Sequence, residues 1–121
     1  MLQFTQSNLL SALDECDDHL LDKLEFGVVA MNPSGTVERY NAAESKIAGL
    51  SAGRVIGKNF FSEVAPCTNN FLVAQRFQDE EALDVTLPYV FTVKMRPRKV
   101  ELRLLKAPAA RRMYLVVRDR A

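Results

Sequence analysis

The chain has 121 residues, of which 48% are hydrophobic and 26% are charged, and its formal net charge is +1. These values are typical of one globular domain, and no apolar run approaches the roughly 20 residues that a membrane-spanning helix needs. The N-terminus lacks a signal-peptide pattern and two cysteines are too few for a disulfide framework, so we expect a cytoplasmic protein with no membrane partner.

Charge is unevenly distributed along the chain. Residues 14–25 carry six acids against Lys23 alone, whereas residues 94–121 carry ten cations against Glu101 and Asp119. A basic end of this kind is consistent with a nucleic-acid surface or with an acidic N-terminal segment that lies against a basic sheet. We favour the second interpretation and expect no nucleic-acid partner, because the cations alternate with apolar residues as they do on solvated strands.

The first quarter of the chain predicts helix followed by a hairpin. Residues 8–24 place leucines and Cys16 at helical spacing, which indicates one or two amphipathic helices. Residues 27–31 are typical of a short buried strand, residues 32–35 of a turn, and residues 36–40 of the return strand.

Shorter elements follow. Asn41 is a good N-cap for a helix that stops near Gly49, and Ser51 is placed to cap a further turn that ends near Gly57. Residues 58–68 mix apolar residues with a proline and predict irregular structure or short helix.

The second half predicts one helix and three strands. The helix covers residues 70–83, and the strands cover residues 85–95, 100–106 and 113–118. The chain therefore reads as an α+β domain with a central five-stranded antiparallel sheet flanked by short helices.

Residues 40–68 place a phenol (Tyr40), a carboxyl (Glu44) and a thiol (Cys67) in one small region. Such groups can hold one small acidic aromatic ligand, which the thiol would tether while the two oxygens bind its far end. A lone cysteine such as Cys67 is more usually a small buried hydrophobe. Pro66 fixes the backbone before it, and the expected helix start at residue 70 favours the reactive thiolate.

Glu44 has two interpretations. With Asn41 it forms a capping-box pattern, in which the carboxyl merely reaches back to a backbone amide. Alternatively it points into the core, where burial keeps it protonated as a hydrogen-bond donor. Strand alternation puts Tyr40 on the face opposite to Val37, so the pattern alone predicts a half-buried side chain.

Sequence motifs for catalysis or metal binding are absent. There is no glycine-rich phosphate loop and no Ser-His-Asp set, and the single histidine, His19, has no metal-ligand spacing beside it. We therefore do not expect an enzyme.

Four segments resemble the photoactive yellow protein family, blue-light receptors with the PAS fold. They are Glu25-Phe26-Gly27, Tyr40-Asn41-Ala42-Ala43-Glu44, Val55-Ile56-Gly57-Lys58-Asn59-Phe60-Phe61 and Val64-Ala65-Pro66-Cys67-Thr68. The similarity is dense from Phe26 to Thr68 and continues more thinly through Tyr89, Phe91 and Met95 to the last strand.

This resemblance implies a 4-hydroxycinnamic acid (p-coumaric acid) chromophore, thioester-linked to Cys67. Tyr40 and Glu44 would bind its phenolate oxygen, and its ring would be surrounded by Phe60, Pro66, Phe91 and Met95. The resemblance also implies a helical cap at residues 1–25 on a PAS core at residues 26–121, and a downstream signalling protein that the sequence does not identify.

Two positions depart from the family. Ala48 replaces a threonine that usually supports the tyrosine, and Leu50 replaces an arginine at the mouth of the pocket. These departures leave open a PAS module without photochemistry that dimerises or binds another small ligand. A redox sensor that uses Cys67, with or without Cys16, is a further hypothesis.

Overall fold

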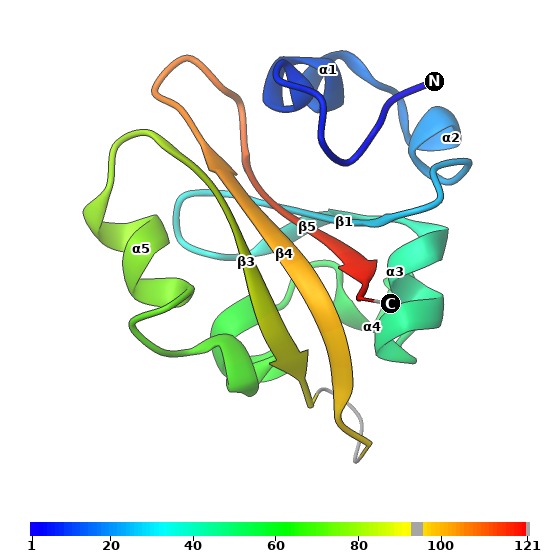
Figure 1. Ribbon diagram of the computed structural model, residues 1–121, viewed down its shortest axis with the longest axis vertical. Coiled ribbons are helices and arrows are strands. Elements are labelled where there is room, and N and C mark those ends of the chain that lie inside the picture. The colour runs from blue at the N-terminus through cyan, green and yellow to red at the C-terminus, as the bar shows by residue number, and fades with distance from the viewer. Residues whose placement is uncertain (93–95, 121) are drawn as a thin grey trace.

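The computed structural model describes residues 1–92 and 96–120, and in that part of the chain no helix is long and apolar enough to cross a membrane. The strands are β1 (Gly27–Met31), β2 (Val37–Tyr40), β3 (Leu83–Phe91), β4 (Arg98–Lys106) and β5 (Met113–Asp119). They form one antiparallel sheet in the order β2-β1-β5-β4-β3 (Figure 1). The predicted five-stranded sheet is therefore confirmed, and the described strands extend beyond the predicted bounds at β4 and β5.

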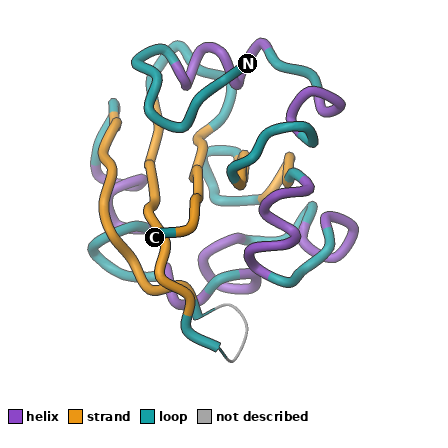
Figure 2. Tube along the Cα trace, turned by 45° about the vertical axis from the view of Figure 1, so that its right-hand side comes forward, coloured by secondary structure: helices purple, strands orange, loops and turns teal. Residues whose placement is uncertain are grey.

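The helices are short and lie on both sides of the sheet, as Figures 1 and 2 show. They are α1 (Leu9–Glu15), α2 (Asp18–Leu21), α3 (Ala42–Ala48), α4 (Ala52–Val55), the π-helical turn η1 (Phe60–Val64), the 3₁₀ turn η2 (Pro66–Thr68) and α5 (Ala74–Asp79). The caps predicted for α3 are confirmed, because the Asn41 side chain accepts from the Glu44 amide and Gly49 takes a left-handed φ of 73°. Ser51 does precede α4, but its side chain makes no capping hydrogen bond.

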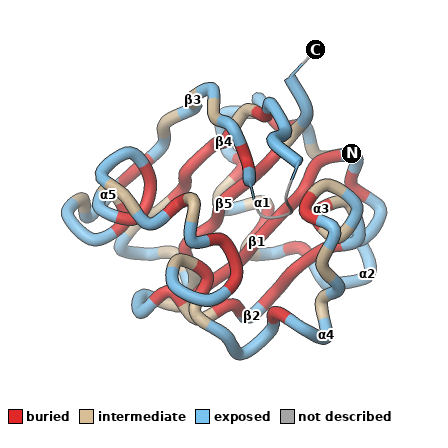
Figure 3. Tube along the Cα trace, turned by 90° about the horizontal axis from the view of Figure 1, so that it is seen from below, coloured by how far each residue is buried: buried red, intermediate tan, exposed pale blue. Residues whose placement is uncertain are grey.

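The sheet separates two hydrophobic cores. Val29 and Met31 of β1 lie in the core beneath α3, α4 and α5, and we call this side of the sheet the helical face. Val28 and Ala30 lie in the core beneath residues 1–26, on what we call the N-terminal face. Figure 3 shows the resulting pattern, with buried residues along the central strands and exposed residues on the outer turns. Strict alternation along β1 thus supplies both cores.

Residues 1–26 are held on the N-terminal face by an apolar core and by arginines that bond to backbone carbonyls. Arg39 is 7% exposed and donates to the carbonyls of Leu13 and Cys16, at 3.0 and 2.6 Å, and to Asp18. Arg103 is 5% exposed and donates to the carbonyls of Phe4 and Gln6, both at 2.8 Å. The acidic segment does lie against the sheet, and its carboxylates also contribute, since Asp14 accepts from Arg111 and Tyr114 and Asp18 pairs with Arg39.

The cations of the C-terminal strands are paired mostly with acids outside the N-terminal segment. The pairs are Arg98–Asp119, Arg103–Asp84, Arg112–Glu38 and Arg118–Glu101. Ion pairs within the sheet therefore neutralise much of the basic stretch, which weakens the nucleic-acid interpretation.

Candidate functional site

A β-bulge decides where Tyr40 points. Pairing between β1 and β2 shifts by one residue, so that Ala30 pairs with Arg39 while Met31 pairs with Val37. Glu38 is the extra residue, and it places Tyr40 in the same core as Val37. The predicted opposite placement was wrong because strand alternation holds only where pairing is regular. Tyr40 is 7% exposed rather than half-buried.

Glu44 enters the helical face from the first turn of α3. Its side chain is 0% exposed, and α3 lies close to β1 at Gly27, where an added Cβ would collide with the Glu44 carboxyl and lie 3.1 Å from its Cα. Gly27 thus makes room for a buried carboxyl. The capping-box interpretation is wrong in its second half, since neither Glu44 oxygen bonds to the Asn41 amide, which donates to Val28 instead.

Tyr40 and Glu44 carry unsatisfied polar atoms. The Tyr40 hydroxyl and both Glu44 carboxyl oxygens are buried and have no hydrogen-bond partner among the described residues. Burial raises the pKa of Glu44 to about 8, and the positive charge of Arg98 opposes that rise. Burial, followed by the neighbouring Glu44, raises the pKa of Tyr40 well above its usual value. Both groups therefore keep their protons at neutral pH, and neither has a hydrogen-bond partner among the described residues.

The segment that carries Cys67 is fixed to β2 by its own backbone. Val37 donates to the carbonyl of Lys58 at 2.9 Å, and Gly57 donates to the carbonyl of Val37 at 2.8 Å. The Asn59 side chain accepts from the amides of Phe61 and Ser62, which starts η1. The turn η1 leads directly into η2, so a continuous set of bonds joins the strand that bears Tyr40 to the turn that bears Cys67.

Cys67 occupies the middle of η2 and packs, partly buried, against the core that contains Tyr40. Its carbonyl accepts from the Tyr89 hydroxyl at 2.5 Å and from the Asn70 side chain at 3.1 Å, which fixes the backbone beside the thiol. The helix expected to begin at residue 70 begins only at Ala74. The prediction that a helix N-terminus at residue 70 stabilises the Cys67 thiolate was therefore wrong, because Asn70 caps an irregular turn before α5.

The residues expected around the ring differ in their placement. Phe60 and Phe91 are 1% and 2% exposed and belong to the same core as Tyr40. Pro66 is exposed and is not part of this core. Met95 lies outside the described residues. Ala48 is buried in this core and Leu50 packs against it, so neither brings a polar group to the site.

Nothing in the sequence indicated that Arg39 and Asn41, which flank Tyr40, hold residues 1–26 against the sheet. Arg39 anchors residues 1–26 as described above. The Asn41 side chain accepts from the Val28 amide at 2.8 Å and donates to the carbonyls of Leu21 and Phe26, at 2.9 and 3.0 Å. Its only sequence signal was the N-cap pattern. The two cysteines lie on opposite faces, Cys16 on the N-terminal face and Cys67 on the helical face, and both are free.

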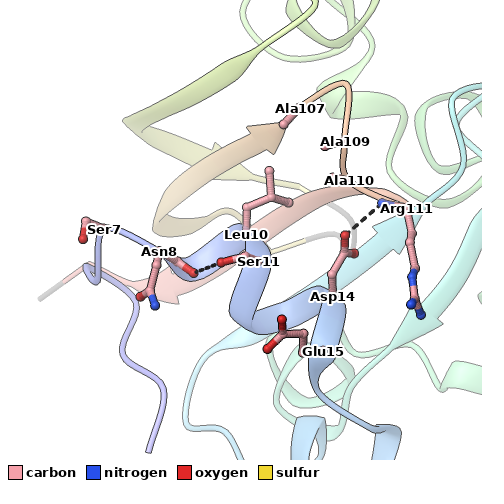
Figure 4. Close-up of a pocket in the computed structure, with 10 residues that line it drawn as sticks. All are labelled: Ser7, Asn8, Leu10, Ser11, Asp14, Glu15, Ala107, Ala109, Ala110 and Arg111. Atoms are coloured by element: carbon pink, nitrogen blue, oxygen red, sulfur yellow. Dashed lines mark hydrogen bonds between the residues drawn. The ribbon is translucent and has the colours of Figure 1, made fainter.

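A separate hollow lies on the other side of the sheet. It measures about 450 Å³ and is formed between α1 and the β4–β5 turn, where Asp14 accepts from the Arg111 amide at 2.8 Å (Figure 4). It includes none of the predicted ligand-binding residues. No cluster of potential metal ligands occurs in residues 1–92 and 96–120.

Comparisons with known proteins agree with the fold. The PAS fold family model matches residues 17–116. The chain is 37% identical over 110 residues to the photoactive yellow protein of Rhodothalassium salexigens and 38% identical over 110 residues to that of Halochromatium salexigens, with 88% of each chain covered in both cases. It superposes with a TM-score of 0.82 and 37% identity on the photoactive yellow protein domain of the sensor histidine kinase Ppr from Rhodospirillum centenum, covering 90% of this chain and 98% of that domain.

Proposed function

Because the chain belongs to the photoactive yellow protein family of PAS-fold proteins, we propose that it is a blue-light receptor that carries p-coumaric acid as a thioester on Cys67. The partner that reads the signal is a further protein that the chain itself does not identify.

The observation that carries the proposal is the set of three unsatisfied atoms on Tyr40 and Glu44. A native core rarely leaves buried polar atoms without partners, since each such atom destabilises the fold by about 1–3 kcal/mol. A phenol and a protonated carboxyl that face the same place match one bound anion, which would accept a hydrogen bond from each. A phenolate oxygen fits this donor set.

Cys67 supplies the second anchor point. Its thiol belongs to a turn whose backbone is fixed by Tyr89 and Asn70, and it packs against the core to which Tyr40, Phe60 and Phe91 belong. A ligand tethered there and bound at its far end by Tyr40 and Glu44 would lie along the helical face, between aromatic side chains that suit a flat ring.

When bound, the chromophore supplies absorption of blue light and isomerisation of a double bond. The protein's part is to respond when the bound anion leaves its donors. Glu44 would then pass its proton to the phenolate oxygen that it had bound, and it would remain as a buried carboxylate. An unpaired buried charge destabilises a fold by several kcal/mol, which is comparable with the total stability of a small domain. Residues 1–26 are the segment we expect to loosen in response.

The test is to express the chain with activated p-coumarate and to record the visible spectrum and the intact mass. We expect an absorption band in the blue and one added coumaroyl group. Cys67→Ala should lose both, whereas the matched control Cys16→Ala should keep both, because Cys16 lies on the other face of the sheet. The proposal fails if wild type gains neither the band nor the mass, or if Cys67→Ala retains them.

A second candidate is a PAS module that binds a different small ligand without photochemistry. The buried Ala48 and the apolar Leu50 favour it, because both make the surroundings of the site less polar than the family pattern. An unmodified mass after supply of activated p-coumarate, together with binding of an untethered aromatic acid that Tyr40→Phe weakens, would favour this module.

A further inference from the structure

One partly exposed arginine of the sheet, Arg98, acts electrostatically on the buried carboxyl of Glu44. Arg98 is the first residue of β4, and its guanidinium holds Asp119 of β5 through two bonds, at 2.6 and 2.7 Å. Its third nitrogen, Nη1, points to the carbonyl of Ile47 at 3.4 Å. Ile47 is one helical turn after Glu44 on α3, so the arginine bridges the end of β5 and the helix that carries the buried carboxyl.

The surroundings of Arg98 allow it to move. Its side chain is 44% exposed and that of Asp119 is 54% exposed. Both line an open surface hollow of about 590 Å³ between α3 and the end of the N-terminal segment. The other charged residues that line this hollow are Asp22, Lys23, Glu25 and Lys46.

Few charges act on Glu44 itself. Tyr40 faces it from β2, and among the described charged groups Arg98 is the one whose field lowers the pKa of Glu44 against the effect of burial. The same arginine lowers the pKa of Asp119 through their hydrogen bonds. One cation therefore serves two carboxyl groups, one on the surface and one in the core.

We propose that Arg98 is a positioning residue that Asp119 and Glu44 share: Asp119 holds it at the surface while Glu44 is protonated, and it turns toward Glu44 when that carboxyl becomes an anion. Asp119 and Glu44 therefore compete for the charge of Arg98, and this competition predicts the direction in which each substitution shifts the pKa of Glu44. Removing Arg98 disfavours the Glu44 anion, whereas removing the charge of Asp119 frees Arg98 and favours that anion. The inference rests on the proposed function only for the event that removes the proton under light.

The first test needs no chromophore. In ligand-free protein with ¹³C-labelled glutamate carboxyls, the Glu44 resonance, identified by its loss in Glu44→Gln, is followed against pH. We expect a midpoint near 8 in wild type, higher by at least about half a pH unit in Arg98→Gln and lower by a similar amount in Asp119→Asn. Arg98→Lys keeps the charge and should recover most of the wild-type midpoint.

Arg76→Gln is the control, because it removes a cation that pairs with Glu80 on α5. It should leave the Glu44 midpoint unchanged. Opposite shifts in Arg98→Gln and Asp119→Asn, with no shift in the control, support the proposal. Any other pattern, including shifts of the same sign in both variants, overturns it.

A second readout uses protein loaded with p-coumaric acid. Infrared difference spectra after a flash report the loss of the Glu44 carboxyl band, and we expect that loss to fall several-fold in Arg98→Gln and to rise in Asp119→Asn. A wild-type protein that takes up no chromophore would end the proposed function but would leave the carboxyl titration intact, so the two failures are distinguishable.

Discussion

The two faces of the sheet treat buried polar groups in opposite ways. On the N-terminal face, Arg39 and Arg103 are almost fully buried, yet each bonds to backbone carbonyls and to a carboxylate. On the helical face, Tyr40 and Glu44 are equally buried, yet their hydroxyl and carboxyl oxygens have no partner within the described residues.

This difference separates contacts that complete the fold from polar atoms that, under the proposed function, would bind a ligand. The N-terminal face gains stability and order from satisfied groups. The helical face leaves the Tyr40 hydroxyl and the Glu44 carboxyl oxygens unsatisfied, which lowers stability in the way expected of a binding site without its ligand. Substitutions of the buried polar residues on the two faces should therefore have opposite effects on stability.

The largest expected effect is the pH dependence that Glu44 gives to the ligand-free protein. Its pKa is about 8 when folded and near 4.5 when unfolded, so the folded state holds a proton that the unfolded state has lost between those values. The unfolding free energy should therefore fall by about 1.4 kcal/mol per pH unit in that range, roughly 5 kcal/mol in all, and level off above pH 8.

Glu44→Gln should remove this slope and make the protein more stable than wild type at alkaline pH, while urea unfolding at acid pH shows little difference. The exposed Glu81→Gln is the control and should keep the wild-type slope. If Glu44→Gln retains the slope, Glu44 does not titrate as a buried group, and the contrast between the faces loses its main support.

The next largest effect is expected at Arg39 on the satisfied face. Arg39→Met leaves the carbonyls of Leu13 and Cys16 and the Tyr114 hydroxyl without this donor, and it should lower the unfolding free energy by about 3 kcal/mol at every pH. Arg112→Met, which removes a more exposed partner of Glu38, should lower it by less than about 1 kcal/mol. Equal losses in the two variants would contradict the role of Arg39 as an anchor.

A smaller effect tests the space around Glu44. Gly27→Ala adds a methyl group that collides with the Glu44 carboxyl, and it should destabilise the protein by about 1–3 kcal/mol in chemical denaturation. Gly53→Ala, in α4 with no atom within 4 Å of the added carbon, should instead stabilise it by about 0.5–1 kcal/mol. A loss of stability in Gly27→Ala together with a gain in Gly53→Ala would show that the helical face is closely packed around Glu44 and that only its polar atoms lack partners.

The smallest effect concerns the outer end of the N-terminal face. The Arg118 guanidinium carbon lies 4.3 Å from the centre of the Phe4 ring. Arg118→Gln should weaken the fold by about 0.5–1 kcal/mol and speed amide exchange in the first residues. A double-mutant cycle with Phe4→Leu measures the coupling, and a coupling of zero would show that Phe4 is held by Phe26 and the apolar core alone.

Local signals in the sequence predicted much of this fold. The unbroken apolar run of Val28, Val29, Ala30 and Met31 indicated a short buried strand, and the Asn41 and Gly49 caps gave α3 its bounds. The helix after Cys67 was predicted too long, because Asn70 begins an irregular turn whose bonds are tertiary as well as local, including one to the Tyr89 hydroxyl at 2.7 Å.

The residues of the candidate site were easier to predict than the directions in which their side chains point. The two-residue alternation of a regular strand does not predict the bulge at Glu38. The direction of the Tyr40 side chain therefore could not be predicted from the sequence. The sequence left Glu44 undecided between a capping role and a place in the core. The structure places it in the core, because Gly27 on β1 leaves space for its carboxyl. Arg39 and Arg98 carried no signal, because surface and buried arginines look alike in a single sequence.

The bulge at Glu38 has a mechanical consequence. Two consecutive residues serve the two faces, Tyr40 at the candidate site and Arg39 at the anchor of residues 1–26, and they are joined by one peptide bond. Under the proposed function, the loss of a contact at the Tyr40 hydroxyl would rotate that peptide and so act directly on Arg39, on the opposite side of the same strand.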